Sequence, residues 1–512
     1  MFVGIDLGTT TSLAAVVDDQ MNTEILQIGA ERLIPSAVYF PPTWQPGQDA
    51  VVGSSALARR QLHPDRVVID SKREMEAADY RFRVGDFRVS AEDVATQILG
   101  FFRRELEHRT GQAVRDAVVT VPAYFQHLGK SHTRKAALAA GFESVRILQE
   151  PVAAALAYHA QQPLEPGERL FVFDLGGGTL DTSVLLVQGE RIEVEVFDGD
   201  DRLGGADFDA CLLDFLLDRF RQQFAFDFRK RFAPVFAARA LAKLSAEARK
   251  TKEALSSLQD VPVRVVLIDE DDEDYELRTS VSRIDFEQVS LPLLERMDKV
   301  VARTLDTAGP VSIDRVALVG GSSRIPFVTR RLGELLKQAP YQDQMPDELV
   351  ARGAGLFHMV TRMAKAGGQA SIPQVRFVSA HSLGILVDQD RLAVLIPKGT
   401  LLPAEFTEGF TTVEDNQEEI DLEVYMGEHL ECCSAKNQLV GEGTISGIEL
   451  GVAGKADVSV TFCLSEEDLL KVEAVDNVTG AREDFELRPG ARSEAGDDDS
   501  WAEEDLDEED ED

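Results

Sequence analysis

Two short stretches of the chain place an aspartate at the end of an apolar run and follow it with glycine and threonine. They are Ile5–Thr10 and Phe173–Thr179. Glycine lets the backbone approach a ligand closely, and successive backbone N–H groups in such a turn form a concavity for phosphate. A carboxylate beside bare phosphate would repel it, so the pattern indicates a cation between the two. Mg²⁺ fits, because it is often held by one or two carboxylates plus substrate phosphates.

A third glycine-rich turn, Gly320–Ser323, also follows an apolar run. One such loop alone would favour an ordinary strand-end turn in which the aspartate caps the backbone. Two near-identical loops and a third turn favour phosphate binding, since a motif gains weight from its context. The echo between the first two loops predicts two related halves that face one another across a cleft.

The segments around these loops predict an α/β fold. Residues 2–5, 117–121, 170–173 and 315–319 have the composition of buried strands that end near Gly or Pro. Apolar residues recur at helical spacing from Val94 to Leu106, and Gly111 is the expected stop. Strands alternating with helices are typical of α/β layers.

The pattern changes along the chain and predicts four parts. Residues 1–372 form the α/β domain, and residues 373–380 form a linker that includes the apolar run Val375–Val378 with Arg376 inside it. Residues 381–488 show short alternating strands separated by Gly and Asn turns, which predicts an antiparallel β-domain. Residues 489–512 form an acidic tail with too little apolar surface to fold, so we expect it to be disordered.

Composition excludes several classes of partner. The chain has 512 residues and a net charge of −37, which disfavours nucleic acid and acidic membranes. No signal peptide and no apolar run of transmembrane length are visible, and the 4 cysteines are too few for a disulfide framework. We therefore expect a cytoplasmic protein with reduced thiols.

The chain resembles the 70-kDa heat-shock (DnaK-type) chaperones, which belong to the actin and sugar-kinase superfamily. The resemblance covers about residues 1–488 and is most similar to the divergent HscC-type bacterial branch. It rests on the stretches Val3–Thr10, Val121–Phe125, Glu150–Tyr158, Phe173–Asp181, Leu203–Asp209, Val319–Pro326 and Thr412–Gln417. It implies an actin-like, duplicated ribonuclease-H-like ATPase domain, followed by a β-sandwich that binds peptide and lacks the usual helical lid.

The resemblance also implies roles for the catalytic residues, with ATP or ADP, Mg²⁺ and K⁺ as ligands. Lys72 would position the attacking water, although alone it would be taken for a solvated surface lysine. Glu150 would join the shell of water around the metal. The metal would be held mainly through water by Asp6, Asp174 and Asp181. Phosphate contacts would come from Gly8, Thr9, Thr10, Gly176, Gly177, Gly178, Thr179 and Gly205.

The implied adenosine site departs from the family pattern. Its matching residues are Lys252, Ser256, Gly320, Gly321, Ser322, Arg324 and Asp347. Arg324 would stack on adenine. However, Arg249 stands where the family usually has an acidic residue, and Glu253 where it has a basic one, so the ribose contact and one stacking face are in doubt.

Four residues of the β-domain match the family's peptide channel: Phe410, Val413, Ile420 and Leu422. Val413 would form one side of an arch over the peptide, with Asp388 opposite. Alternatively, Phe410, Ile420 and Leu422 are simply sandwich core, as alternating apolar positions usually are. Residues linked to interdomain signalling would be Pro122, Lys130, Arg376 and Phe377.

Three functions are compatible with these features. The first is an ATP-driven chaperone for unfolded or extended apolar peptides, with a J-domain co-chaperone and an uncertain need for an exchange factor. The second is a carbohydrate kinase of the same superfamily, which would leave the β-domain unexplained. The third is a regulatory protein that senses ATP without remodelling clients. Acceleration of ATP consumption by a peptide or by a sugar discriminates among them.

Overall fold

The computed structural model describes residues 1–60, 62–188, 191–342, 345–365, 374–375, 379, 381–387, 391–429, 437–466 and 469–485. The chain forms two compact units. The first comprises Met1–Val378 with Leu401–Pro403 and Leu464–Leu469, and the second comprises the remaining residues from Ser379 onward. Each unit is described by itself.

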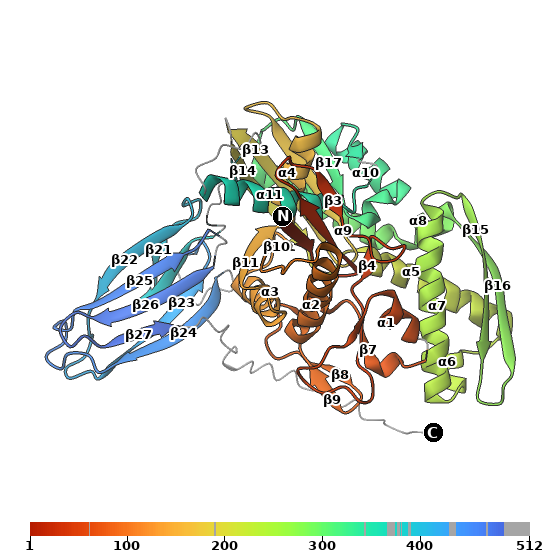
Figure 1. Ribbon diagram of the computed structural model, residues 1–512, viewed down its shortest axis with the longest axis horizontal. Coiled ribbons are helices and arrows are strands. Elements are labelled where there is room, and N and C mark those ends of the chain that lie inside the picture. The colour runs from red at the N-terminus through yellow and green to blue at the C-terminus, as the bar shows by residue number, and fades with distance from the viewer. Residues whose placement is uncertain are drawn as a thin grey trace, which may run out of the picture. The chain divides into compact units, whose positions relative to one another are not determined.

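The first unit contains two sheets with the same strand order (Figure 1). In the first sheet the order is β11-β10-β1-β2-β3, and in the second it is β18-β17-β12-β13-β14, with β19 added at the edge. The first is built from β1 (Phe2–Asp6), β2 (Thr11–Val17), β3 (Thr23–Ile25), β10 (Asp116–Val121) and β11 (Ser144–Gln149). The second is built from β12 (Arg169–Leu175), β13 (Leu180–Gln188), β14 (Arg191–Asp200), β17 (Arg315–Val319), β18 (Tyr341–Gln342) and β19 (Gln374–Val375).

The pairings repeat as well as the order. β1 runs antiparallel to β2 and parallel to β10, and β12 runs antiparallel to β13 and parallel to β17. The two aspartate loops therefore occupy equivalent hairpin turns, β1–β2 and β12–β13. The predicted α/β fold with two related halves is confirmed at this level.

Helices α4 (Glu150–Gln161) and α11 (Leu349–Lys365) follow the fifth strand of each half and cross between the sheets. α11 contacts β1 and β2, while α4 contacts β12 and β13, so each helix also packs on the other half's sheet. Their crossing is very close: a Cβ on Gly353 would lie 1.7 Å from the Ala153 carbonyl oxygen. Buried His358 fixes α11 further, since its Nδ1 lies 3.0 Å from the Val3 backbone nitrogen.

Each half carries an insertion that builds one wall of the cleft. The first contains α1 (Ser54–Arg59), η2 (Ser71–Glu74) and α2 (Ala91–Thr110), with β4 (Ile34–Pro35), β5 (Val38–Tyr39), β6 (Val51–Val52), η1 (Pro64–Arg66), β7 (Val67–Val68), β8 (Phe82–Val84) and β9 (Phe87–Val89). The expected helix is α2. It begins at a Ser90–Asp93 capping box and ends at Gly111, whose φ of 66° is the left-handed conformation that glycine favours.

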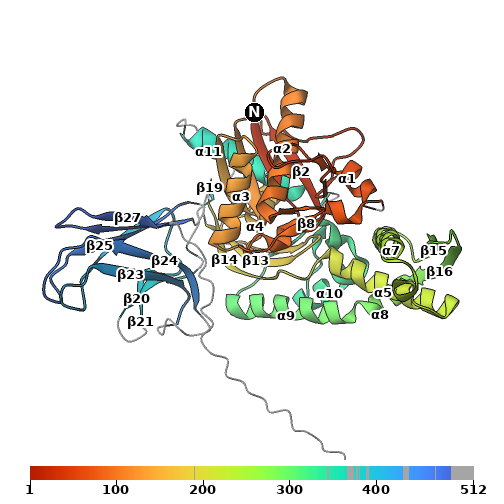
Figure 2. The same cartoon turned by 90° about the horizontal axis from the view of Figure 1, so that it is seen from below.

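The insertion of the second half is a helical wall with a β-hairpin (Figure 2). Its elements are α5 (Gly205–Phe224), α6 (Phe228–Arg231), α7 (Pro234–Leu255), β15 (Asp260–Ile268), β16 (Asp274–Ser282), α8 (Arg283–Val289) and α9 (Leu291–Ala308). Aromatic rings fill its interior: Phe220 packs against Phe228, with 5.4 Å between ring centroids, and both are fully buried. Such a core makes the wall a rigid support for the residues at the start of α5 and the end of α7. The remaining helices of the unit are α3 (His127–Ala139), η3 (Gly321–Arg324) and α10 (Pro326–Leu336).

The second unit contains two four-stranded antiparallel sheets, ordered β21-β20-β23-β24 and β22-β25-β26-β27. The strands are β20 (Leu383–Val387), β21 (Arg391–Ile396), β22 (Ala404–Phe410), β23 (Glu419–Met426), β24 (Gln438–Ser446), β25 (Val458–Leu464), β26 (Leu470–Asp476) and β27 (Arg482–Phe485). Buried positions alternate along β25, from Val458 to Leu464, as expected when one face of a sheet is covered. Every regular element described in residues 379–485 is a strand. The predicted lid deletion and acidic tail concern residues outside the described part.

Candidate functional site

The two aspartate loops lie in direct contact. A Cβ on Gly177 would lie 1.9 Å from Thr10 Oγ1, and one on Gly178 would lie 2.5 Å from Thr9 Oγ1. Distances this short leave no room for a side chain, so glycine is required where the loops meet. The cleft floor is therefore closed by backbone from both halves.

The third glycine turn joins the same floor. Gly320 has a φ of 77°, and a Cβ there would lie 2.5 Å from the Leu175 carbonyl and 2.6 Å from Asp174 Oδ1. The parallel pairing of Asp174 with Val319 brings the end of β17 beside the end of β12. All three predicted loops are thus neighbours.

Four carboxylates and one ammonium group line the centre. Asp174 and Asp181 are direct cross-strand partners, so their side chains share a face of the sheet. Lys72 Nζ donates to Glu150 Oε1 at 2.5 Å, and both side chains are buried. The sequence-only interpretation of Lys72 as a solvated surface lysine is therefore wrong, because η2 carries it into the cleft with 6% of its surface exposed.

Burial and neighbouring negative charge strongly raise the pKa values of three of the carboxyl groups. Burial, reinforced by Glu150 and opposed by Lys72, raises the pKa of Asp6 to about 7 and that of Asp181 to about 8. The pKa of Asp174 is raised well above its ordinary value by burial, Glu150 and Asp181. One lysine cannot offset so many negative charges, so the site favours an additional cation.

The donor set fits Mg²⁺ held through water. Asp181 Oδ1 and Thr10 Oγ1 are buried, and neither has a hydrogen-bond partner among the described residues. No three His, Cys, Asp or Glu side chains of the described chain converge closely enough to hold a metal directly. Carboxylates that are close but not convergent suit an ion that keeps its water shell, as Mg²⁺ does. When bound, that ion would neutralise phosphate charge beside Asp6, Asp174 and Asp181.

A pocket in the cleft gathers most of the predicted phosphate and metal residues. Its lining includes Asp6, Gly8, Thr9, Thr10, Lys72, Glu150, Asp174, Gly176, Gly177, Thr179, Gly320, Gly321 and Asp347. Of the other predicted residues, Asp181 adjoins it through Thr179, whose Oγ1 donates to Asp181 Oδ2 at 3.2 Å. Gly205 N donates to the Gly176 carbonyl at 3.0 Å, which ties the start of α5 to the second loop.

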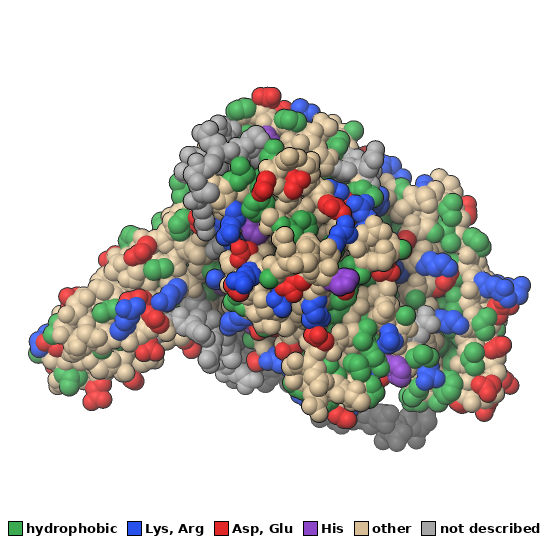
Figure 3. Space-filling view, viewed as in Figure 1, with side chains coloured by type: hydrophobic (Ala, Val, Ile, Leu, Met, Phe, Trp, Pro, Cys, Tyr) green, Lys and Arg blue, Asp and Glu red, His purple; other side chains and the backbone are tan. Residues whose placement is uncertain are grey.

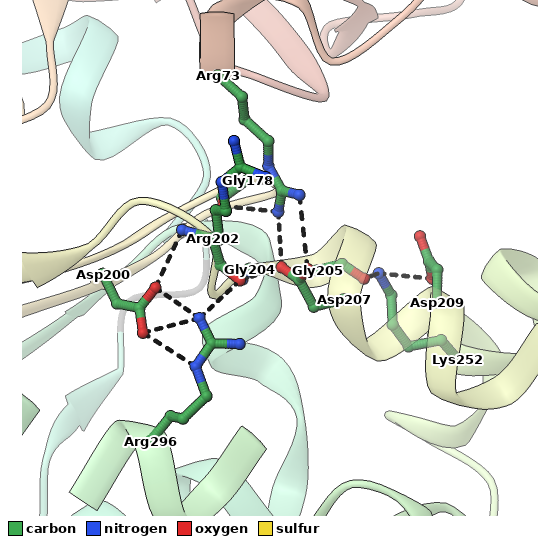
Figure 4. A network of polar contacts seen from close by, with 10 residues as sticks. All are labelled: Arg73, Gly178, Asp200, Arg202, Gly204, Gly205, Asp207, Asp209, Lys252 and Arg296. Atoms are coloured by element: carbon green, nitrogen blue, oxygen red, sulfur yellow. Dashed lines mark hydrogen bonds and ion pairs between the residues drawn. The ribbon is translucent and has the colours of Figure 1, made fainter. Parts of the chain in front are cut away.

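An ion-pair network behind this pocket was not predicted from the sequence (Figure 4). Arg73 Nη2 donates to the Gly178 carbonyl at 2.7 Å and to Asp207 Oδ2 at 2.6 Å. The same carboxylate accepts from Gly204 N at 2.7 Å, so Asp207 caps α5 and holds Arg73 at once. The signal was present in the sequence: Arg73 follows Lys72 directly, and Asp207 stands three residues after Gly204, at a capping-box position.

Arg296 anchors the loop from the other side. Its guanidinium reaches Asp200 at 2.7 Å and the Arg202 carbonyl at 3.0 Å (Figure 4). The loop between β14 and α5 is therefore fixed at both ends. This matters for the site because Gly204 ends that loop and Gly205 begins α5.

The predicted adenosine residues are split between α7 and the η3 turn. Lys252 Nζ contacts Asp209 and the Gly205 carbonyl, both at 2.8 Å. Arg324 Nη2 donates to Asp347 Oδ2 at 2.8 Å, so its guanidinium is held by a carboxylate. The backbone of Ser256 caps α7, and its carbonyl accepts from Arg283 at 2.9 Å. Ser322 is buried at the start of η3.

The exchanged charges pair with one another. Arg249 Nε donates to Glu253 Oε1 at 3.1 Å along one face of α7. The Glu253 side chain is 61% exposed, and such surface pairs contribute little stability. Arg249 therefore remains available to a ligand.

Two of the residues predicted for signalling are buried. Pro122 follows β10 directly, and Lys130 on α3 is 3% exposed beside Glu76. Arg376 and Phe377 lie outside the described residues. Immediately before them, β19 pairs in parallel with the edge strand β14, with Val375 opposite Ile192.

The predicted peptide residues differ in exposure. Val413 is 62% exposed, Phe410 and Ile420 are partly buried, and Leu422 is 4% exposed. Leu422 thus has the burial of a core residue, as the alternative interpretation expects for that position. Asp388 lies outside the described residues.

The surface charge pattern and the helices bear on nucleic-acid and membrane partners. Basic and acidic side chains are interspersed on the face drawn in Figure 3, so this face presents no single-sign field of the kind that attracts nucleic acid. Among the described helices, none combines the length and apolar character that crossing a bilayer requires.

Taken together, these groups can position phosphate between two glycine loops and stabilise charge on it. Phosphoryl transfer to water needs little more than positioning and electrostatics. The arrangement provides backbone amides, threonine hydroxyls, a buried ammonium and carboxylates for a hydrated cation.

Comparison with known proteins identifies the family. The family model described as "Hsp70 protein" matches residues 2–81 and 76–512. The chain is 33% identical over 492 residues to the chaperone protein DnaK of Halobacterium salinarum, which covers 96% of this chain and 75% of that relative. The DnaK proteins of Thermosipho africanus and Deinococcus proteolyticus are each 33% identical over 93% of this chain, with 78% and 77% of their own lengths covered. The resemblance to 70-kDa heat-shock proteins is confirmed, and the chain belongs to the Hsp70 family.

Proposed function

We propose that the protein is an ATP-dependent chaperone that binds and releases extended apolar segments of unfolded proteins. The observation that carries the proposal is the single pocket shared by both aspartate loops, the Lys72–Glu150 pair and the third glycine turn. In a member of the Hsp70 family, that pocket is suited to hydrolysis of ATP. The β-domain is suited to the client.

Each group in the pocket has a proposed task. Thr9, Thr10 and Thr179 bind phosphate through their hydroxyls and amides. The adenosine is contacted by Lys252, Arg324 and Asp347. Lys72 orients the attacking water and stabilises charge that develops on the terminal phosphate. The hydrated Mg²⁺, with K⁺ beside it, sits against Asp6, Asp174 and Asp181, and Glu150 fixes both Lys72 and the metal waters.

Coupling to the client runs through the linker in this proposal. Backbone pairing of β19 with β14 supports it, because a strand added to the edge of a sheet gains hydrogen bonds without a dedicated pocket. Pro122 adjoins these carboxylates through the next residue, Ala123, whose backbone N–H donates to Asp181 and offsets a small part of the rise that burial causes in the pKa of that carboxyl. Movement of the linker or of Pro122 would therefore shift the groups that contact the phosphates.

Peptide binding is proposed at the β22–β23 end of the β-domain. Val413 lies exposed in the loop between these strands, while Phe410 at the end of β22 and Ile420 in β23 are partly buried. An extended client would gain backbone hydrogen bonds and insert one apolar side chain. A J-domain protein is the proposed partner that couples client delivery to hydrolysis.

The decisive experiment measures steady-state ATP consumption with an unfolded apolar peptide, with a panel of sugars, and alone. We expect the peptide to accelerate hydrolysis and sugars to have no effect. Val413→Asp should weaken the peptide's half-saturation several-fold, whereas Val478→Asp, at a loop position of similar exposure in the same domain, should not. Acceleration by a sugar with no peptide effect would establish a kinase instead.

A further inference from the structure

A second, larger cavity lies in the cleft of the first unit, beside the phosphate pocket. Its volume is about 540 Å³, within the range that small-molecule sites occupy. It shares only Thr9 and Thr10 with the phosphate pocket. Arg249, which stands at the family's ribose-contact position, lines it, whereas none of the residues predicted to hold adenosine does. A ligand here would therefore be a neighbour of the nucleotide rather than a replacement for it.

Most of the cavity wall is apolar and made of small residues. Leu57 and Ile69 come from the first half, and Ala210, Leu213 and Ala246 come from α5 and α7 of the second. Small side chains leave space, and apolar walls favour a ligand with a hydrocarbon or aromatic body. Phosphate or water alone would leave that surface without a partner.

Cations stand at the edge of this apolar wall. Arg60, at the end of α1, and Arg249 and Lys250 of α7 all line the cavity. Burial lowers the pKa of the Arg60 guanidinium, and Asp70 offsets this effect only in part. Arg249 pairs with the exposed side chain of Glu253 and also interacts with Asp70 and Asp209.

The acidic groups in the wall are already engaged. Asp209 is paired with Lys252 at 2.8 Å. Asp70 faces three guanidinium groups, those of Arg73, Arg60 and Arg249, and is held in a left-handed conformation with φ of 55°. A non-glycine residue in that conformation is strained, and strain of this kind gathers at binding sites. The surplus in the cavity is positive.

We propose that this cavity binds a small organic anion with an apolar body while nucleotide occupies the neighbouring pocket. The anionic group would bridge Arg60 and Arg249, and the body would lie against Ile69, Leu213 and Ala246. Because the walls come from both halves, such a ligand would hold the halves together and slow nucleotide release. By thermodynamic reciprocity, bound nucleotide would raise the affinity of the cavity for the anion. The first part of the inference, the binding itself, does not depend on chaperone activity.

The test uses the full-length chain and the aromatic sulfonate anilinonaphthalene sulfonate as the probe. Its fluorescence is titrated with protein that is nucleotide-free or saturated with Mg-ADP. We expect one site per chain that persists in Mg-ADP. Arg60→Gln should weaken binding by at least about fivefold, since hydrogen bonds to charged groups are worth that much. Arg59→Gln, one residue earlier on the same helix but outside the cavity lining, should change it by less than about twofold.

A filling variant gives a second readout. Ala246→Phe should fill the cavity and abolish the probe site. It should leave the Mg-ADP affinity within about threefold of the parent, because Ala246 lines the cavity but not the phosphate pocket. Release of labelled ADP should slow several-fold with probe in the parent but not in Ala246→Phe. Displacement of the probe by Mg-ADP in a one-to-one manner would overturn the proposal, as would equal affinity in Arg60→Gln and Arg59→Gln. Neither result bears on peptide-stimulated hydrolysis, so the proposed function would stand separately.

Discussion

The Lys72 ammonium lies 2.5 Å from Glu150 Oε1, and both groups are buried among three further carboxylates. The pair joins the first insertion to the start of α4. In the proposed mechanism, Lys72 contacts the terminal phosphate, and Glu150 neutralises its charge in the absence of nucleotide. Exchange of Glu150 for phosphate as the partner of Lys72 is the simplest way for this pair to act.

Replacing Lys72 by alanine should preserve ATP binding and slow hydrolysis by about 100-fold or more, the usual cost of one preorganised donor to a transition-state charge. Single-turnover hydrolysis with excess enzyme checks this directly. Lys135→Ala, an exposed lysine of α3, is the control and should behave as the parent. Near-normal hydrolysis by Lys72→Ala would refute the catalytic assignment.

Two adjacent glycines of the second loop should differ in their response to alanine. At Gly177 the new Cβ would lie 1.9 Å from Thr10 Oγ1, whereas at Gly176 the nearest neighbouring atom is 3.8 Å away. We expect Gly177→Ala to lower the free energy of unfolding by about 1–3 kcal/mol, the range for overpacking. Gly176→Ala should stay within about 0.5 kcal/mol, as substitutions away from such contacts do. Urea denaturation without nucleotide measures both, and equal stabilities would mean that the loops are not in contact.

Stability of the Mg²⁺-free protein should fall as the pH rises from about 4 to 8. The pKa of Asp6 is raised to about 7 and that of Asp181 to about 8, so both bind protons more tightly in the folded state. Stability from such groups is fully present below the unfolded pKa near 4 and is lost as pH rises through the folded values. Asp227, whose pKa the Arg229 hydrogen bond lowers to about 2, acts in the opposite direction only below about pH 4.

Chemical denaturation in a chelating buffer across this pH range provides the measurement. Asp181→Asn removes one titrating group and should flatten the dependence of stability on pH between pH 6 and 8. That window is set by the pKa values of about 7 for Asp6 and about 8 for Asp181. Added Mg²⁺ should flatten it in the parent, because the ion favours the ionised carboxylates. A slope unchanged in both cases would mean that the cluster ionises normally.

Linker variants should alter the rate of ATP hydrolysis in opposite directions. Arg376→Leu would complete the apolar run and favour its docking beside β14, raising the rate. Phe377→Asp would disfavour docking and lower it, since a fully buried aromatic side chain contributes about 1.5–3 kcal/mol. Steady-state rates with and without peptide test both variants. If neither differs from the parent, the linker is a passive tether.

The repeat of the aspartate loops was enough to predict two halves, and the strand order follows that prediction closely. The position of Lys72 was not predictable from its neighbours, because nothing in Ser71–Arg73 indicates burial, and only the resemblance singled it out. The capping-box position of Asp207 was visible in the sequence, but its ion pair with Arg73 joins insertions 134 residues apart, which local patterns do not reveal. The cavity at Arg60 and Arg249 likewise arises from surfaces distant in sequence, which local patterns cannot join.

The crossing of α4 and α11 limits how the cleft can open. With the Ala153 carbonyl seated where Gly353 has no side chain, one helix cannot slide along the other without a backbone clash. Rotation about the point of contact would leave that carbonyl in place. We therefore expect the crossing to act as a pivot, so that small displacements near the phosphates become larger ones at the outer ends of both insertions. Through such a rotation, the loss of a single phosphate group would change the position of the edge of the sheet, far from the atoms that react.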